Sequence, residues 1–158
     1  NGYKAALSRH GINEDQGLIY ESDYSYNGGA MGARKLLSLT NRPTAIVCSN
    51  DTMAMGAIKT ACEQGLTIPE DISITGFDDI TVASQIHPAL TTVAAPIKQI
   101  AERSVETLIS LVEGTAPENI HIALPTQLII RDSCASQKEQ IDTDEEQPSS
   151  RELLCQLK

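Results

Sequence analysis

Residues 43–65 read PTAIVCSNDTMAMGAIKTACEQG. The apolar run 45–48 predicts a short strand of the kind found in the middle of a parallel sheet. Asn50 or Asp51 is then suited to cap a helix, whose apolar positions recur at helical spacing until Gly65 ends it. A strand, a polar cluster and a helix in this order are typical of a βα unit.

The same order occurs once before this stretch and once after it. A strand expected over Leu18–Tyr20 leads to Asp23 and Tyr24, and a strand over residues 72–76 leads through Phe77 to two aspartates, 78 and 79. If the three strands are parallel members of one sheet, their polar clusters all lie along its carboxyl edge. Open α/β sheets bind their ligands at that edge, so the pattern predicts a binding site.

The remaining elements continue the alternation of helix and strand. We expect a first helix from Tyr3 to Gly11, a fourth strand over residues 90–93, and an amphipathic helix over 97–113 with one apolar stripe. An extended segment is expected over 120–130. The predicted fold class is therefore α/β with a parallel sheet.

Composition excludes several classes of function. The net charge is -9, with 21 acidic and 12 basic residues, so this stretch should repel a nucleic-acid backbone. No apolar run approaches the roughly 20 residues of a membrane span. Cys48 and Cys62 belong to no CxxC pair and are expected to be small buried hydrophobes, as in a cytoplasmic protein with reduced thiols.

Catalytic patterns are not found in the sequence. The three histidines, His10, His87 and His121, are scattered, and there is no nucleophile elbow. The glycines in residues 27–32 do not form a phosphate-binding pattern. We therefore expect no enzyme activity, no catalytic residue, no cofactor and no metal site.

Four blocks resemble the lactose- and galactose-repressor (LacI/GalR) family of transcriptional regulators, in the family's order and spacing. They are PTAIVCSNDTMAMGA at residues 43–57, GLTIPEDISITGFDD at 65–79, PALTTV at 88–93 and LIIRDS at 128–133. The resemblance covers about residues 1–133. It implies a lobe of a periplasmic-binding-protein-like effector domain, namely its C-terminal subdomain.

The resemblance also implies a division of the chain. Residues 1–93 would form the C-terminal lobe used for effector binding and dimerisation, and 94–133 a crossover helix with a returning strand. Residues 134–158, rich in acidic and polar side chains, are expected to be a disordered tail. We expect the first lobe and the DNA-reading domain to be largely missing, so that the stripe on 97–113 stays exposed or finds another partner and the chain associates or is marginally stable.

By the same resemblance, Tyr24, Asn50 and Asp78 are the effector-binding residues. Their chemistry is suitable, because a carboxylate accepts hydroxyl hydrogen bonds, an amide donates and accepts, and a ring covers an apolar face. Each has an alternative: Asn50 as a helix cap only, Tyr24 as an ordinary exposed ring, and Asp78 as a cap of a short helix near residue 80. Asp79 is the better candidate for that last cap, and Asp23 is expected to be a turn residue.

The implied partners follow from the family. They are a small sugar-like or nucleoside-like effector, a second copy in a homodimer, and DNA only through the missing domain. The apolar side chains Met53, Met55, Val82 and Ile86 would suit the dimer contact, although we expect Met53 and Ile86 to face the core. The rival interpretation is a periplasmic sugar-binding protein of a transport system, which has the same two-lobe fold.

Overall fold

The computed structural model describes residues 2–116 and 120–136. In chain order the elements are α1 (Gly2–Arg9), a 3₁₀ helix η1 (Gln16–Leu18), α2 (Tyr26–Leu37), β1 (Ala45–Val47), α3 (Asp51–Glu63), β2 (Ser73–Thr75), a second 3₁₀ helix η2 (Thr81–Ser84), β3 (Thr92–Ala94), α4 (Ile97–Val112) and β4 (Gln127–Ile129).

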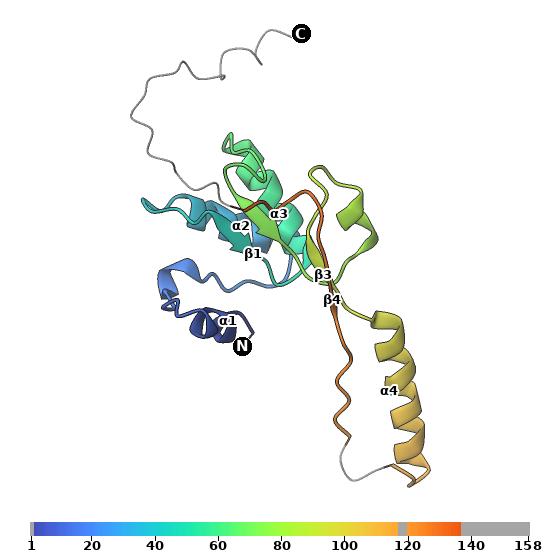
Figure 1. Cartoon of the computed structure of the whole chain (residues 1–158). Coiled ribbons are helices and arrows are strands. Elements are labelled where there is room, and N and C mark those ends of the chain that lie inside the picture. The colour runs from blue at the N-terminus through green and yellow to red at the C-terminus, as the bar shows by residue number, and fades with distance from the viewer. Residues whose placement is uncertain (1, 117–119, 137–158) are drawn as a thin grey trace, which may run out of the picture.

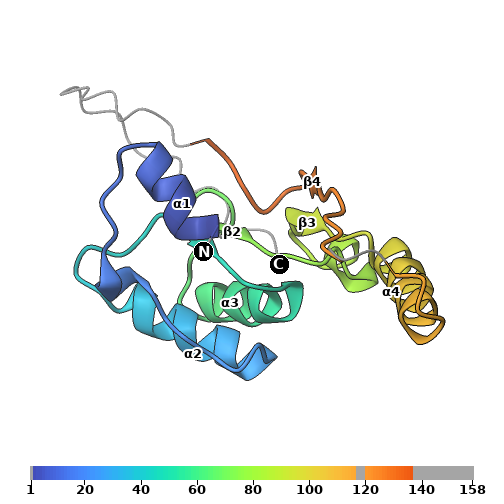
Figure 2. The same ribbon diagram turned by 90° about the horizontal axis from the view of Figure 1, so that it is seen from below.

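The body of the molecule consists of β1 and β2 covered by α2 and α3. The two strands are parallel, with Ile46 opposite Ile74, and both of these side chains are buried. Figures 1 and 2 show α2 and α3 together on one side of the strands and α1 on the other. On the side away from α2 and α3, Val47 is 65% exposed, so this short sheet has one covered face. The buried apolar core comprises Ala33, Leu36, Leu37, Ile46, Cys48, Met53, Ala54, Ala57, Ile58, Ala61, Ile68, Ile72, Ile74, Ala83 and Leu90.

A glycine lets α2 and α3 approach each other closely. A Cβ atom placed on Gly56 of α3 would lie 2.1 Å from the carbonyl oxygen of Tyr26 in α2. No side chain can be accommodated at that distance, so the contact is between the two backbones. This contact fixes α2 against α3, and therefore places the starts of both helices near each other.

The third and fourth strands form a second ladder, in which the strands are antiparallel. Strand β3 pairs antiparallel with β4, with Val93 opposite Leu128. Isolated parallel bridges, Thr75 to Thr91 and Asp78 to Ala94, connect β3 and the residue before it to the β2 side. The architecture is α/β with a parallel component, as predicted. The single parallel sheet that we expected is wrong in detail, because the described strands form two separate two-stranded ladders.

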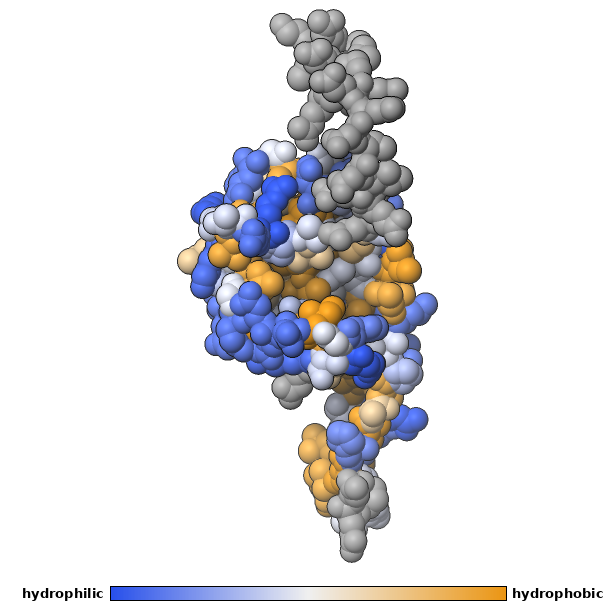
Figure 3. Space-filling model, turned by 60° about the vertical axis from the view of Figure 1, so that its left-hand side comes forward, coloured by the Kyte–Doolittle hydropathy of each residue, from blue (hydrophilic) through white to orange (hydrophobic). Residues whose placement is uncertain are grey.

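Beyond β3 the chain forms an arm, which we define as residues 97–116 and 120–126. Figure 1 shows it extending away from the body. The helix predicted over 97–113 is confirmed as α4, but none of its residues is buried. The apolar stripe is exposed, as expected, with Leu108 61% accessible, and Figure 3 shows apolar residues on this lower extension.

The strand predicted over Leu18–Tyr20 is wrong. The side chain of Asp15 accepts a hydrogen bond of 2.8 Å from the backbone N–H of Gly17, and this draws residues 16–18 into the η1 turn. Ile19 and Tyr20 then follow outside any strand, without pairing to the neighbouring edge of β1. A short apolar run is therefore not sufficient for a strand when a local side-chain bond favours a turn.

Two further expectations concern Cys62 and the tail. Cys48 is buried, but Cys62 is exposed near the end of α3, so the expectation of a buried thiol is wrong at Cys62. The expected disordered tail falls almost entirely on residues 137–158, which lie outside the described residues. Within residues 2–116 and 120–136, no helix has both the length and the apolar character that crossing a bilayer requires.

Candidate functional site

The segment before α2 forms a tight turn that presents Tyr24. The Asp23 carboxylate accepts a hydrogen bond of 3.1 Å from the backbone N–H of Ser25, which confirms Asp23 as a turn residue. Hydrogen bonds from Ser25, chiefly from its side chain and then from its backbone, hold the pKa of Asp23 below its ordinary value.

Tyr24 has a φ of 62°, and 65% of its surface is exposed. Ser25 caps α2 by accepting from Gly28 N–H at 2.9 Å. The Tyr24 ring is therefore accessible to a ligand.

Asn50 connects two of the predicted site residues. Its side-chain oxygen accepts from the backbone N–H of Met53 at 2.8 Å, so the predicted role as cap of α3 is confirmed. Its amide nitrogen donates to the carbonyl oxygen of Tyr24 at 3.0 Å. The Asn50 side chain thus joins the start of α3 to the turn before α2. An Asn amide has two N–H groups and two oxygen lone pairs, so it retains capacity for a further partner.

Asp78 follows β2 at the same edge. Its backbone N–H donates to the carbonyl oxygen of Val93 at 2.9 Å, and its φ is 110°. The half-buried carboxylate accepts no hydrogen bond from any described residue. Burial, and then the negative charge of Asp51, raise the pKa of Asp78. An acceptor without a protein partner at this edge is what a hydroxyl-bearing ligand needs.

The backbone places Asp78 close to Asn50. Asp51 N–H, one residue after Asn50, donates to the carbonyl oxygen of Phe77, one residue before Asp78, at 2.9 Å. The hydrogen bond from Asn50 to Tyr24 continues the chain of contacts. The three predicted residues are therefore brought together at the carboxyl edge of β1 and β2. We call this edge, with Tyr24, Asn50 and Asp78, the rim.

Asp79 does not cap η2, so that expectation is wrong. Its carboxylate instead pairs with the guanidinium of Arg131 at 2.6 Å, and the same guanidinium donates to the carbonyl oxygen of Leu90 at 2.8 Å. The residue before η2, Ile80, has no side-chain cap bond. Asp79 and Arg131 are 52 residues apart, so no local pattern in the sequence indicates this pair.

Sequence reasoning also missed the role of Asp51. Its side chain is completely buried, accepting from Ile80 N–H at 2.8 Å with one oxygen and from the Thr92 hydroxyl with the other. The sequence indicates Asp51 only as an alternative cap, because an Asp at a helix start has that role most often. One signal in the sequence points to a second role. Asn50 and Asp51 are both good capping residues, and α3 needs only one cap.

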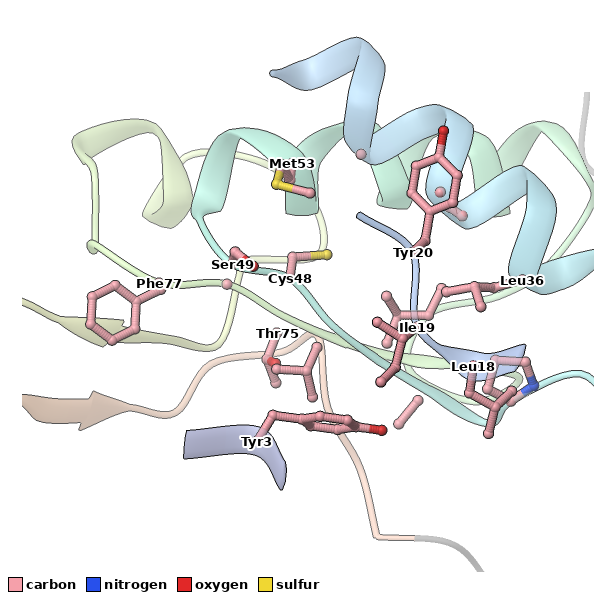
Figure 4. Close-up of a pocket in the computed structure, with 18 of the residues that line it drawn as sticks. Tyr3, Leu18, Ile19, Tyr20, Leu36, Cys48, Ser49, Met53, Thr75 and Phe77 are labelled. Atoms are coloured by element: carbon pink, nitrogen blue, oxygen red, sulfur yellow. The ribbon is translucent and has the colours of Figure 1, made fainter. Parts of the chain in front are cut away.

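A cavity of about 650 Å³ lies beside the rim, between β1, α2 and residues 18–20 (Figure 4). Its walls are mainly apolar, and Figure 4 shows Tyr3 on one side of β1 and the helices on the other. At the rim end it reaches Ser49 and Phe77, which are the sequence neighbours of Asn50 and Asp78. None of Tyr24, Asn50 and Asp78 lines this cavity, so the polar site and the cavity are adjacent but separate.

The chemistry of the rim is that of recognition. It offers a carboxylate acceptor, an amide and an exposed ring, which together can hold a polar molecule with one apolar face. In the part of the chain that the structure describes, no three His, Cys, Asp or Glu side chains gather in a way that could hold a metal ion.

Comparison with known proteins gives a consistent result. A family model described as periplasmic binding protein-like domain matches residues 1–134. The HTH-type transcriptional regulator MalR of Clostridium butyricum is 44% identical over 134 residues, which are 85% of this chain and 40% of MalR. The ribose operon repressor of Haemophilus influenzae is 37% identical over 137 residues, covering 87% of this chain and 41% of that repressor.

A solved structure is similar in the same region. It is a LacI family transcriptional regulator from Enterococcus faecium with bound ribose, with a TM-score of 0.77 and 33% identity, covering 87% of this chain and 50% of that chain. The chain spans about 40% of the length of the curated relatives that it matches.

Proposed function

The chain belongs to the LacI/GalR family, within its periplasmic-binding-protein-like effector domain, and we propose that its rim binds a small effector. The effector would be a sugar-like or nucleoside-like molecule. The observation that carries the proposal is the convergence of Tyr24, Asn50 and Asp78 at one edge, with the Asp78 carboxylate free to accept.

Each residue has a distinct role in this proposal. Asp78 accepts hydrogen bonds from hydroxyl groups of the effector. Asn50 contributes its remaining amide capacity while it caps α3. The Tyr24 ring packs on the apolar face of a sugar or base, a contact for which its exposed position is suitable. The rim acts by binding alone, so we propose no catalytic role, no cofactor and no metal.

The wider function is also a proposal. We propose that the whole protein represses transcription in the cytoplasm and contacts DNA through a domain outside this chain, because a net charge of -9 opposes direct binding here. Effector binding would shift the protein between two states of different DNA affinity. The transport interpretation is not favoured, since the relatives named above are transcriptional regulators or repressors.

We further propose a homodimer that uses the flank formed by α3 and η2. Met53 and Ile86 face the core, as expected, and this leaves the partly exposed Met55 and Val82 for the contact. Replacing Met55 with Glu should shift the chain toward monomer in sedimentation. An unchanged sedimentation profile over a wide range of concentrations would contradict this interface.

Calorimetric titration with ribose and with a nucleoside such as cytidine tests effector binding. Asp78→Ala should weaken binding by about 10-fold to 150-fold, because a hydrogen bond to a charged group contributes roughly 1.5–3 kcal/mol. Asp132→Ala, at an exposed aspartate whose backbone N–H donates to the carbonyl oxygen of Ala89, is the matched control and should bind as the parent does. Equal affinity of Asp78→Ala and the parent would overturn the assignment, as would failure of the parent to bind any sugar or nucleoside.

A further inference from the structure

Residues 77–80 form a turn whose backbone is hydrogen-bonded to neighbouring elements at three of its four residues. The carbonyl oxygen of Phe77 accepts from Asp51 N–H at 2.9 Å, and Asp78 N–H donates to the carbonyl oxygen of Val93 at 2.9 Å. Ile80 N–H donates to the Asp51 carboxylate at 2.8 Å. Two of the elements around the turn, α3 and β3, therefore hold its backbone.

The turn needs this support because its backbone is strained. Asp78 has a φ of 110° and Asp79 a φ of 57°, in a region where residues other than glycine are uncommon. Such conformations persist only where the surrounding structure enforces them. Without its anchors, the turn would relax toward ordinary dihedral angles and the Asp78 side chain would move.

Asp51 is the most deeply placed of these anchors. Its carboxylate is completely buried, and its two oxygens accept from Ile80 N–H and from the Thr92 hydroxyl. A buried carboxylate is costly unless it is hydrogen-bonded, and here both oxygens have partners. The carboxylate fits because residue 76 is a glycine. A Cβ atom on Gly76 would lie 2.2 Å from the nearer carboxylate oxygen of Asp51.

The capping of helix α3 does not explain why a carboxylate is buried at residue 51. Asn50 already caps the helix through Met53 N–H. Asp79 within the turn pairs with the guanidinium of Arg131. Among the charged side chains in the part of the chain that the structure describes, Asp51 bonds to the turn's backbone, through Ile80 N–H.

We propose that Asp51 is a positioning residue of the effector site: its buried carboxylate holds the 77–80 turn in the strained conformation that keeps the Asp78 carboxylate unpaired at the rim. The proposal rests on the proposed function for the identity of the site, but Asp51 itself does not touch the effector. It acts through Ile80 in the turn and Thr92 in β3, both of which donate to its carboxylate.

Asp51→Asn is the most direct variant, since it keeps the size of the side chain. Asn has one oxygen acceptor, so the bond to Ile80 N–H loses the assistance of the charge, and the bond with the Thr92 hydroxyl is lost or reversed in direction. The variant also removes the charge that helps to raise the pKa of Asp78. Ile58→Val, which trims a buried side chain in the same helix, is the control for general loss of stability.

Three measurements on the full chain test the proposal. Amide exchange of Asp78 and Ile80 should accelerate by about tenfold or more in Asp51→Asn, whereas α2 amides should not change. The NMR-titrated pKa of Asp78 should fall, because the neighbouring charge is gone and the loosened turn is better hydrated. Ribose affinity should fall by about tenfold or more. Ile58→Val should change none of the three.

The outcomes separate the two proposals. If the parent binds ribose and Asp78→Ala does not, but Asp51→Asn matches the parent in affinity and in Asp78 pKa, the positioning role is wrong and the proposed function stands. If the parent binds no sugar or nucleoside while exchange and the Asp78 pKa change as expected, the effector site fails and Asp51 still positions the turn. Should Asp51→Asn not fold, Thr92→Val removes one of the two donors with little change in volume, and unaltered exchange at Ile80 in that variant would overturn the proposal.

Discussion

Helices α2 and α4 both carry an apolar stripe at helical spacing, yet their surroundings are opposite. In α2 the stripe packs against α3 and the strands, and Leu36 is only 8% exposed. In α4 no residue is buried, and Leu108 is 61% exposed. Periodicity therefore identifies a helix and its apolar face, but it does not identify the partner of that face. The body of the molecule is stabilised by packing that the arm lacks.

The strongest test of this contrast is a matched pair of truncations. Leu36→Ala should lower the free energy of unfolding by about 2–5 kcal/mol, because it leaves a cavity in the core. Leu108→Ala should change it by no more than about 0.5 kcal/mol, because the side chain is already in solvent. Urea denaturation of both variants measures the difference. Comparable losses in the two would mean that the arm is packed in solution and that the contrast is wrong.

A second pair tests how closely the body is packed. Gly56→Ala should cost about 1–3 kcal/mol, since the new Cβ atom would meet the Tyr26 carbonyl oxygen at 2.1 Å and force α2 and α3 apart. Gly2→Ala in α1, where nothing lies within 4 Å, should be neutral or slightly stabilising, because Ala favours helix by roughly 0.5–1 kcal/mol. Thermal unfolding gives both values, and a tolerated Gly56→Ala would show that the helices can separate freely.

A smaller effect distinguishes the inside of the body from its surface. Burial, and then the charge of Asp51, raise the pKa of Cys48 to about 12, so at pH 8 almost none of it is the reactive thiolate. Cys62 is exposed. In single-cysteine variants, a thiol reagent should label Cys62 at least about a hundredfold faster than Cys48. Similar rates would indicate that the body opens readily.

The sequence predicts the elements that depend on local patterns. The strand–helix unit of β1 and α3, the cap at Asn50 and the long helix α4 follow from apolar spacing and capping chemistry. The proximity of Asn50 and Asp78 follows from one further rule, that parallel strands end at a common edge. Tyr24 joins them although the strand predicted before it is absent, because the Asn50 amide donates to its carbonyl oxygen across 26 residues.

What could not be predicted depends on contacts between distant residues. The ion pair of Asp79 with Arg131 and the burial of Asp51 against Thr92 are formed only when β3 packs beside β2. The failed strand at Leu18–Tyr20 has a local cause, the Asp15 side chain, which competes with strand formation. Cys62 is exposed although its neighbour Ala61 is completely buried, because successive helix residues point about 100° apart and Cys62 falls at the margin of the buried face.

NMR mapping can show whether an effector binds at the rim of the body, as we propose. Adding ribose to the isotope-labelled chain should shift the amide signals of Tyr24, Asn50 and Asp78, while the signals of α4 stay in place. If the shifts fall on α4 or on the apolar walls of the cavity around Leu36, and the three rim amides do not move, the effector does not bind at the rim.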